Sequence, residues 1–186
     1  MVRRSLTVAA ALGSLLLCQM GPVRALAAGA PTVPVACPGT QSGCIHAMLT
    51  ILNHDRHAAG LAPLKLTMTQ TNGYAACVGS LGHSVAMAQT GTIWHTNSRD
   101  PKASFPRNIC MRYSTAGENV GMSASGDEMQ DLKGLDKLMM SEPHNASVCA
   151  STANHACNIL NPQFHRVGIG LYQSGTTTWL TEDFVN

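Results

Sequence analysis

The sequence predicts a protein of the α+β class, in which helices and antiparallel strands occupy different parts of one chain. Two observations support this prediction. Apolar residues recur with helical spacing in three segments before residue 143, whereas residues 167–185 have the alternation and β-branched composition of a β-hairpin. This order differs from the regular strand-helix-strand alternation of a parallel sheet, so it favours α+β over α/β.

The first helix is predicted from apolar residues at positions i, i+3, i+4 and i+7. These residues are Ile45, Met48, Leu49 and Leu52. Gly60 and Pro63 follow this pattern and end it. A second helix with the same spacing is predicted from Tyr74 to Ala88, and Gly91 ends it shortly before His95.

A long irregular loop is predicted next, because residues 97–116 are polar and contain two prolines. Loops of this length are usually functional or held by a crosslink. A third helix follows, since Ser125 to Glu128 fits a capping box and Pro143 ends the segment. Its apolar stripe consists of Leu132, Leu135, Leu138 and Met139. Residues 145–156 are again predicted to be irregular.

The end of the chain is predicted to form the hairpin. Apolar residues alternate with small or amphipathic ones in the order Val167, Gly168, Ile169, Gly170, Leu171, Tyr172. Ser174 and Gly175 supply the turn, and residues 176–185 are rich in β-branched and aromatic side chains. The two glycines of the first strand are expected to allow close packing.

The N-terminus has the features of an export signal. Arg3-Arg4 precede an apolar run from Leu6 to Cys18, and Ala25-Leu26-Ala27 offers a small-x-small cleavage site. We therefore expect residues 1–27 to be a signal peptide and the protein to be secreted, without a permanent membrane span. Lipidation at Cys18 is disfavoured because a large residue precedes it, and the twin-arginine route stays open.

After the signal, residues 28–43 are rich in proline and small residues and are expected to form an N-terminal arm or linker. Residues 44–186 have the length of one domain. Removing residues 1–27 takes away three arginines and no acidic residue, which leaves nine basic against ten acidic residues and a formal charge of −1. A chain without a basic patch and with few aromatic residues is not expected to bind nucleic acid.

Six cysteines remain after the signal, and in an exported chain they imply three disulfides. Sequence alone allows 15 pairings of six cysteines. We predict the pairs Cys37–Cys44, Cys77–Cys110 and Cys149–Cys157. Two of these pairs are local, and the middle one would tie the long loop to the second helix.

Five fragments occur in a fixed order along the chain. They are residues 52–64, Gly91–His95, Gly117-Glu118-Asn119-Val120, the segment from His155-Ala156-Cys157-Asn158-Ile159-Leu160 to Val167-Gly168-Ile169-Gly170, and Trp179–Phe184. Together they resemble the CAP superfamily (cysteine-rich secretory, antigen 5 and pathogenesis-related 1 proteins; SCP domain). The resemblance implies a three-layer α-β-α sandwich with a mostly antiparallel sheet over residues 44–186. It does not fix one activity.

In CAP proteins, two histidines and two glutamates from distant parts of the chain meet in a central cleft. The matching residues here are His95, Glu118, Glu142 and His155. Two imidazoles with one or two carboxylates suit a divalent metal, zinc above all, and leave a coordination position for water. The same groups could also do acid-base work, because neighbouring carboxylates and histidines push their pKa values apart.

Two assignments depart from the family pattern. An insertion separates Glu142 from His155, so His144 is a rival for the cleft position. We prefer His155 because the motif that follows it comes in the expected order. The usual tryptophan before this segment is replaced by Leu138 or Met139, so Glu142 has the weakest support of the four.

Two other arrangements are weighed and disfavoured. Cys149, His155 and Cys157 could form a zinc site, but export favours a disulfide between the two cysteines. His83-Ser84 suggests a serine hydrolase, yet the sequence around the serine lacks a nucleophile elbow.

The resulting expectation is a secreted CAP-domain protein that acts by binding and not by turnover. Its cleft would hold a divalent metal and a small ligand, lipid or peptide. One alternative is a metal-assisted hydrolase of peptide or cell-envelope substrates, with Glu118 or Glu142 as general base. The other is a disulfide-stapled structural or interaction module whose cleft residues form a polar network.

Overall fold

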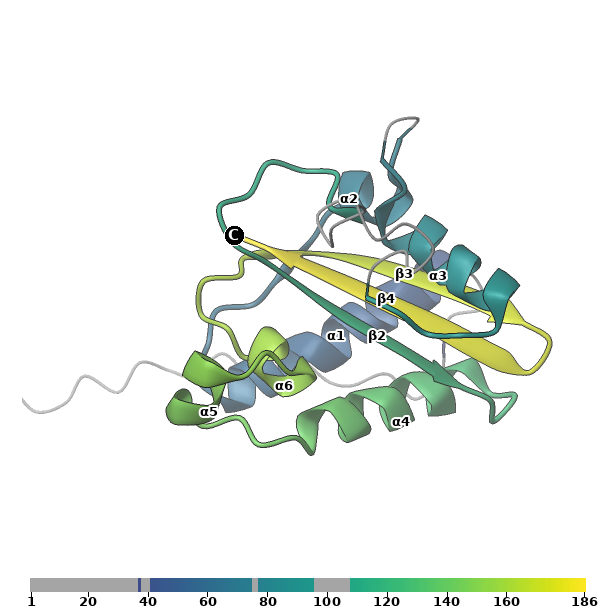
Figure 1. The fold of residues 1–186 in the computed structure, drawn as a ribbon. Helices are drawn as coiled ribbons and strands as arrows, with labels where there is room; N and C mark the ends of the chain where they lie inside the picture. The colour runs from purple at the N-terminus through teal and green to yellow at the C-terminus, as the bar shows by residue number, and fades with distance from the viewer. Residues whose placement is uncertain (1–36, 38–40, 75–76, 96–107) are drawn as a thin grey trace, which may run out of the picture.

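The computed structural model describes residues 37, 41–74, 77–95 and 108–186. The predicted signal peptide and most of the predicted arm and long loop lie outside these residues. In chain order the elements are α1 (Gln41–Ala58), β1 (Lys65–Leu66), α2 (Met68–Asn72), α3 (Gly79–Thr90), β2 (Ala116–Ser123), α4 (Glu128–Met140), α5 (Ala146–Ser151), α6 (His155–Ile159), β3 (Arg166–Ser174) and β4 (Thr177–Val185) (Figure 1).

The predicted α+β class is confirmed by a sheet with the strand order β1-β3-β4-β2. Strands β3 and β4 form the predicted hairpin, and β2 pairs antiparallel with β4. The short strand β1 pairs parallel with β3, so the sheet is mixed and not purely antiparallel. The long antiparallel pairs make the Gly117–Val120 motif part of β2, next to the C-terminal strand.

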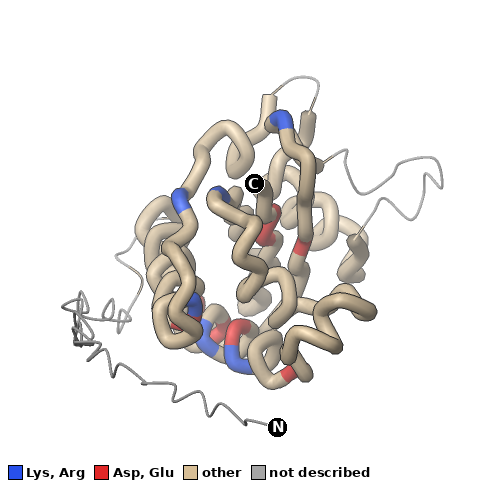
Figure 2. Tube along the Cα trace, turned by 90° about the vertical axis from the view of Figure 1, so that its left-hand side faces the viewer, with Lys and Arg blue, Asp and Glu red and all other residues tan. Residues whose placement is uncertain are grey.

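Helices cover both faces of the sheet and create three layers (Figure 1). Helices α2 and α3 pack on one face, and α1, α4 and α6 pack on the other. The second interface is apolar and contains most of the core, including Met48, Leu52, Leu132, Ile169 and Phe184. Figure 2 shows acidic positions on strands in the middle of the molecule, which is an unusual place for carboxylates.

Two glycines of β3 allow helices to approach the sheet closely, as the sequence suggested. A Cβ atom added at Gly170 would lie 2.0 Å from the carbonyl oxygen of Ser80 on α3, and one at Gly168 would lie 2.3 Å from the side chain of Gln70 on α2. These positions therefore hold α3 and α2 against the strand at a distance that only glycine permits.

Arg56 fixes the segment that follows α6. Its guanidinium is buried in the core and donates hydrogen bonds to the carbonyl oxygens of Ala62, Ile159, Asn161 and Phe164. A single side chain thus ties α1 to the chain between α6 and β3.

Several boundaries differ from the prediction. Helix α1 begins at Gln41, before the predicted domain start at residue 44. Helix α3 begins at Gly79 and not at Tyr74, because Gly73 and Gly79 adopt positive φ angles of 67° and 69°, which interrupt a helix. Residues 145–156 were predicted to be irregular, but they contain α5 and the start of α6.

Helix α4 follows the predicted period with two differences. Its N-cap is Asp127, whose side chain accepts a hydrogen bond from the Gln130 N–H. Leu138, predicted to face the core, is 68% exposed, whereas Met139 is buried. The apolar stripe is therefore narrower than the sequence suggested. A helix has 3.6 residues per turn, so two successive steps of three residues from Leu132 carry Leu138 off the buried face, whereas Met139, seven residues on, returns to it.

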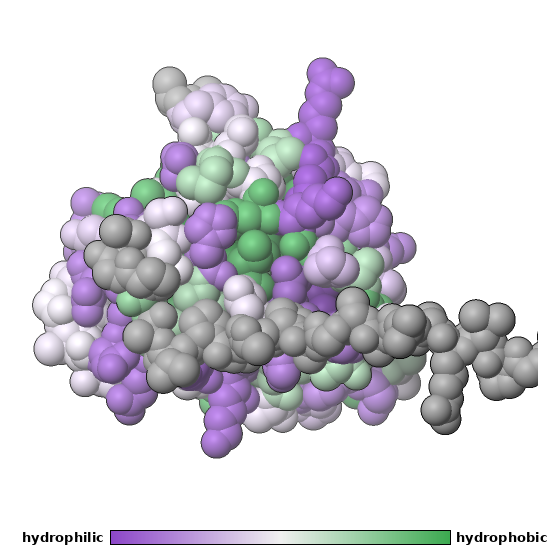
Figure 3. All heavy atoms as spheres, turned by 180° about the vertical axis from the view of Figure 1, so that it is seen from behind, coloured by the Kyte–Doolittle hydropathy of each residue, from purple (hydrophilic) through white to green (hydrophobic). Residues whose placement is uncertain are grey.

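All three predicted disulfides are present: Cys37–Cys44, Cys77–Cys110 and Cys149–Cys157. In residues 37, 41–74, 77–95 and 108–186, every helix is too short or too polar to span a bilayer. On the surface seen in Figure 3, apolar side chains gather in a patch bordered by hydrophilic ones.

Candidate functional site

The four predicted cleft residues lie around one cavity of about 430 Å³. They come from four places in the chain: His95 follows α3, Glu118 lies on β2, Glu142 follows α4, and His155 begins α6. The remaining lining residues are Ala116, Gly117, Ala153, Asn154 and Asn158. The fold therefore brings together side chains that are far apart in sequence.

Glu118 is the buried centre of one half of the site. Its Oε1 atom lies 3.2 Å from His95 Nδ1, and its Oε2 atom lies 3.0 Å from His83 Nδ1 and 3.0 Å from the amide nitrogen of Asn108. Burial acts to raise the pKa of Glu118, but the hydrogen bonds and charge of its histidine neighbours outweigh burial and lower that pKa. Glu118 is thus a carboxylate that orients the half-exposed His95 ring.

Glu142 and His155 form the other half. Glu142 Oε1 lies 2.7 Å from His155 Nδ1, and its Oε2 accepts a hydrogen bond of 2.7 Å from the His155 backbone N–H. Partial burial opposes ionisation, yet the contacts with His155 lower the pKa of Glu142. Asn154, the N-cap of α6, fixes the start of this short helix and with it the position of His155.

The two halves face each other across the cavity. The ring centres of His95 and His155 are 6.0 Å apart, with 34° between the ring planes. In each histidine the Nδ1 atom contacts a glutamate, so the Nε2 atom is left to bind a ligand or metal. This is the arrangement in which a carboxylate orients a metal-binding imidazole.

The four predicted residues are arranged as two pairs. Among the described residues, three His, Cys, Asp or Glu donor atoms come within 4.8 Å of one another only in the group Cys37, Cys44 and Glu128. The cleft therefore contains two histidine-glutamate pairs and not a closed four-ligand cage.

The rival histidine lies outside this cavity. His144 is exposed, and its Nδ1 atom contacts the backbone oxygen of Glu142 at 2.7 Å. The alternative zinc set is also ruled out, because Cys149 and Cys157 are joined in a disulfide. Of His144 and His155, it is His155 that lines the cleft.

Two residues that hydrogen-bond Glu118, His83 and Asn108, were not among the predicted cleft residues. His83 is a buried partner of Glu118. The hydroxyl of its neighbour Ser84 hydrogen-bonds with Gly170 O at 3.0 Å and with Thr181 Oγ1 at 2.9 Å, and not with a histidine. Ser84 is therefore a packing residue and not a nucleophile. Asn108 lies within the predicted long loop, where no sequence pattern pointed to it.

Asn158 and Asn119 support the cleft from the sheet. Asn158 donates to the Glu118 backbone oxygen and to Asn119 Oδ1, and Asn119 donates to the His155 backbone oxygen and to Glu182. Asn158 belongs to the His-x-x-Asn fragment of the sequence motif, so its role in the motif is to join α6 to β2.

Carboxyl groups also lie behind the cleft. Asp183 is fully buried on β4 opposite Glu118 on β2, and burial together with the charge of Glu118 raises the pKa of Asp183 well above its ordinary value. Its Oδ2 atom accepts hydrogen bonds from Ser80 and Gln70. Two carboxyl groups therefore share the buried side of the cleft.

No family model matches the chain, and no protein of known function matches it in sequence. Solved structures do resemble it. An extracellular SCP-domain protein from Bacillus anthracis str. Ames has a TM-score of 0.54 at 19% identity, over 78% of this chain and 41% of that one. Venom allergen-like protein 4 from Schistosoma mansoni has a TM-score of 0.51 at 11% identity, over 76% and 87%.

A cysteine-rich secretory protein from Staphylococcus aureus subsp. aureus Mu50 has a TM-score of 0.50 at 17% identity, over 80% of this chain and 40% of that one. This chain thus spans about two fifths of the two bacterial proteins. Identities this low establish the fold and not the activity. The chain therefore has the fold of the CAP superfamily, that of its SCP domain.

Proposed function

We propose that the cleft binds a divalent metal ion through the Nε2 atoms of His95 and His155, with Glu118 and Glu142 orienting the two rings. The observation that carries this proposal is the pairing of each Nδ1 atom with a carboxylate. Such a contact fixes the tautomer with its lone pair on Nε2 and makes the ring a better ligand.

The spacing of the two rings supports the proposal. Because a Zn–N bond is about 2.0–2.1 Å long, two imidazoles on one zinc ion have ring centres roughly 5–6 Å apart. The observed separation is 6.0 Å. Neutral imidazoles are borderline ligands that suit zinc better than calcium or magnesium.

Two protein ligands leave coordination positions to water or to a bound molecule. The cavity, at about 430 Å³, is large enough for a small ligand or the end of a peptide or lipid. We infer that the protein is secreted and acts by binding such a molecule, whose oxygen or nitrogen atom would complete the coordination.

Binding fits the two carboxylates better than metal-assisted hydrolysis does. A general base must be able to accept a proton from water. Glu118 already accepts hydrogen bonds from His83, His95 and Asn108, and both oxygens of Glu142 contact His155. Both glutamates are thus engaged in holding histidines.

The test is a calorimetric titration of Zn²⁺ into the oxidised, chelator-treated protein. We expect one ion per chain, and we expect His95→Ala and His155→Ala each to weaken binding by at least about tenfold, because loss of an orienting residue alone costs 10–100-fold. His144→Ala is the matched control, since this histidine lies outside the cavity, and it should bind like the parent.

Circular dichroism must show that the variants remain folded. Zinc binding by His95→Ala and His155→Ala with the affinity of the parent would refute the proposal. A parent that does not bind zinc would refute it as well. If His95→Ala then lowered only thermal stability, the four residues would be a polar network in a structural module.

A further inference from the structure

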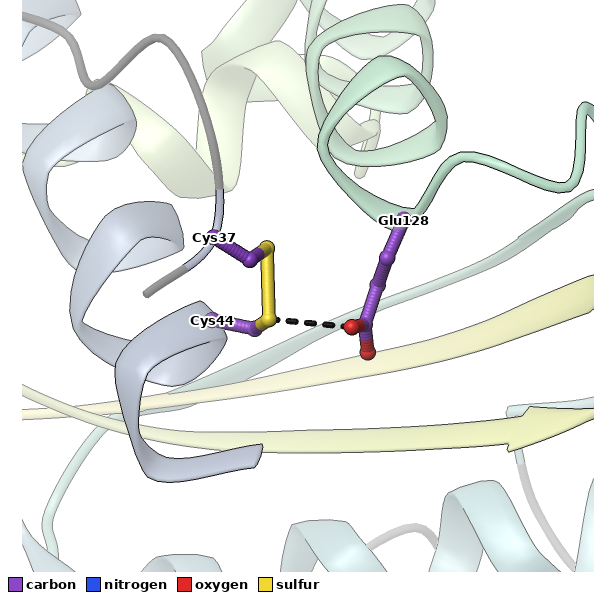
Figure 4. A group of neighbouring side chains, drawn as sticks. All are labelled: Cys37, Cys44 and Glu128. Atoms are coloured by element: carbon purple, nitrogen blue, oxygen red, sulfur yellow. Dashed lines mark hydrogen bonds between the residues drawn. A yellow bond between two sulfur atoms is a disulfide. The ribbon is translucent and has the colours of Figure 1, made fainter. Parts of the chain in front are cut away.

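A second group of metal-binding side chains lies away from the cleft, where the arm meets the domain. Figure 4 shows the Cys37–Cys44 disulfide beside the carboxyl group of Glu128. One donor atom from each of these residues lies within 4.8 Å of the other two. Glu128 Oε2 is 3.0 Å from Cys44 Sγ.

The chain builds this group from the starts of two long helices. Cys44 lies in the first turn of α1, and Glu128 is the first residue of α4, after the N-cap Asp127. Helix N-termini favour negative charge, and both helices begin close to this group.

Burial makes the two sulfur atoms unequal. Cys44 is 1% exposed and belongs to the apolar core, whereas Cys37 and Glu128 are only partly buried. Cys37 and Glu128 are thus the more exposed members of the group.

Among the described residues, no Lys, Arg or His forms an ion pair with Glu128. A disulfide sulfur carries no proton. The contact between Glu128 and Cys44 is therefore a hydrogen bond only when the Glu128 carboxyl group is protonated and donates that proton to the sulfur. Asp131 is already occupied, because it accepts hydrogen bonds from Ser125 N–H and the Thr178 hydroxyl.

We propose that Cys37, Cys44 and Glu128 form a redox-gated site for a thiophilic divalent metal, which the dithiol form binds and the disulfide form does not. Two thiolates and a carboxylate supply three ligands of a tetrahedral zinc-type site, with a fourth position open to solvent. The site goes beyond the proposed cleft function and uses none of its residues.

The chemistry balances with a small dithiol as reductant. The dithiol gives two electrons to the Cys37–Cys44 bond and becomes a disulfide, while its two protons pass to the cysteine sulfurs. Binding of the metal then releases these two protons, because thiolates are the ligands. In the return step a small-molecule disulfide takes two electrons from the two thiolates and leaves as two thiolates, the Cys37–Cys44 bond forms again, and the ion is released.

The experiment uses Co²⁺, because thiolate ligation of Co²⁺ produces a charge-transfer absorption that histidine and carboxylate ligands do not. The full chain is treated with limiting dithiol until alkylation and mass spectrometry show Cys37 and Cys44 reduced and the other four cysteines still paired. We expect this absorption in the reduced protein and its loss on reoxidation.

Three variants separate this site from the cleft. Cys37→Ser should abolish the absorption, and the isosteric Glu128→Gln should weaken Co²⁺ binding by at least about tenfold. His95→Ala should leave the absorption unchanged, so failure of the cleft proposal and failure of this one are distinguishable. A reduced, folded parent without the absorption would overturn the proposal. An absorption that persists in Cys37→Ser would also overturn it, and so would Glu128→Gln if it bound Co²⁺ with the affinity of the parent.

Discussion

Glu182 is a carboxyl group in the interior of the protein, and replacing it by glutamine should remove much of the pH dependence of folding. It lies on β4 with no exposed surface, and one oxygen accepts a hydrogen bond from Asn119. Its second oxygen has no hydrogen-bond partner within the described structure. Asp136 of α4 faces it, and Asp55 of α1 faces Asp136.

Burial raises the pKa of Glu182 from 4.5 to about 8. The folded protein therefore keeps a proton that the unfolded chain loses above pH 4.5. The contribution of Glu182 to stability is fully present below that pH and is lost as the pH rises through about 8. One pKa unit corresponds to about 1.4 kcal/mol, so the free energy of unfolding should fall by about 3 kcal/mol between pH 5 and pH 8 from this group alone.

The assay is urea denaturation at pH 5, 6, 7 and 8, followed by circular dichroism with the disulfides intact. Glutamine has the shape of a protonated glutamate and carries no charge, so Glu182→Gln should resemble the parent near pH 5 and be more stable at pH 8. Asp183 titrates in both proteins and cancels in the comparison. The charge of Glu182 also raises the pKa of Asp136, so Glu182→Gln removes that part of the Asp136 contribution as well and acts in the same direction. A pH dependence in Glu182→Gln as steep as that of the parent would refute the reasoning.

Three further predictions concern packing, and each is measured by the free energy of unfolding. Gly170→Ala should lower it by about 3 kcal/mol, because the new Cβ would meet Ser80 O. The control is Gly134→Ala in helix α4, where a new Cβ would have no atom within 4 Å, and this change should raise the free energy of unfolding by about 0.5–1 kcal/mol. Equal effects of the two substitutions would contradict the close approach of α3. Arg56→Lys should cost about 2–4 kcal/mol because lysine cannot satisfy all four carbonyl oxygens, and a neutral result would contradict the clamp. Ser84→Ala should cost about 1–3 kcal/mol with zinc affinity unchanged, and altered zinc binding would contradict its packing role.

The sequence was most informative where one physical signal dominated. Helix α1 and the β3–β4 hairpin follow from apolar periodicity and turn residues. The disulfides Cys37–Cys44 and Cys149–Cys157 follow from local spacing and export, and Cys77–Cys110 is the pair that then remains. Strand β1 and helix α2 were not predicted, because elements of two and five residues are too short to show a period. Their positions depend on tertiary contacts with β3 and α3.

The candidate site was predictable in its members but not in its arrangement. The motif fragments identified His95, Glu118, Glu142 and His155, and all four line the cavity. Which histidine nitrogen contacts which carboxylate depends on side-chain geometry that no spacing encodes. The buried hydrogen-bond partner of Glu118 could not be predicted either. In sequence His83 is an ordinary helix residue, and it faces the site only because α3 packs on the sheet.

The most direct test of the central claim is a crystal structure of the oxidised protein grown with zinc, with anomalous diffraction recorded on both sides of the zinc absorption edge. We predict an anomalous peak in the cleft, about 2.0–2.1 Å from the Nε2 atoms of His95 and His155, with Glu118 and Glu142 still on the Nδ1 atoms. A cleft without such a peak at saturating zinc, or a peak bound by only one of these histidines, would contradict the account.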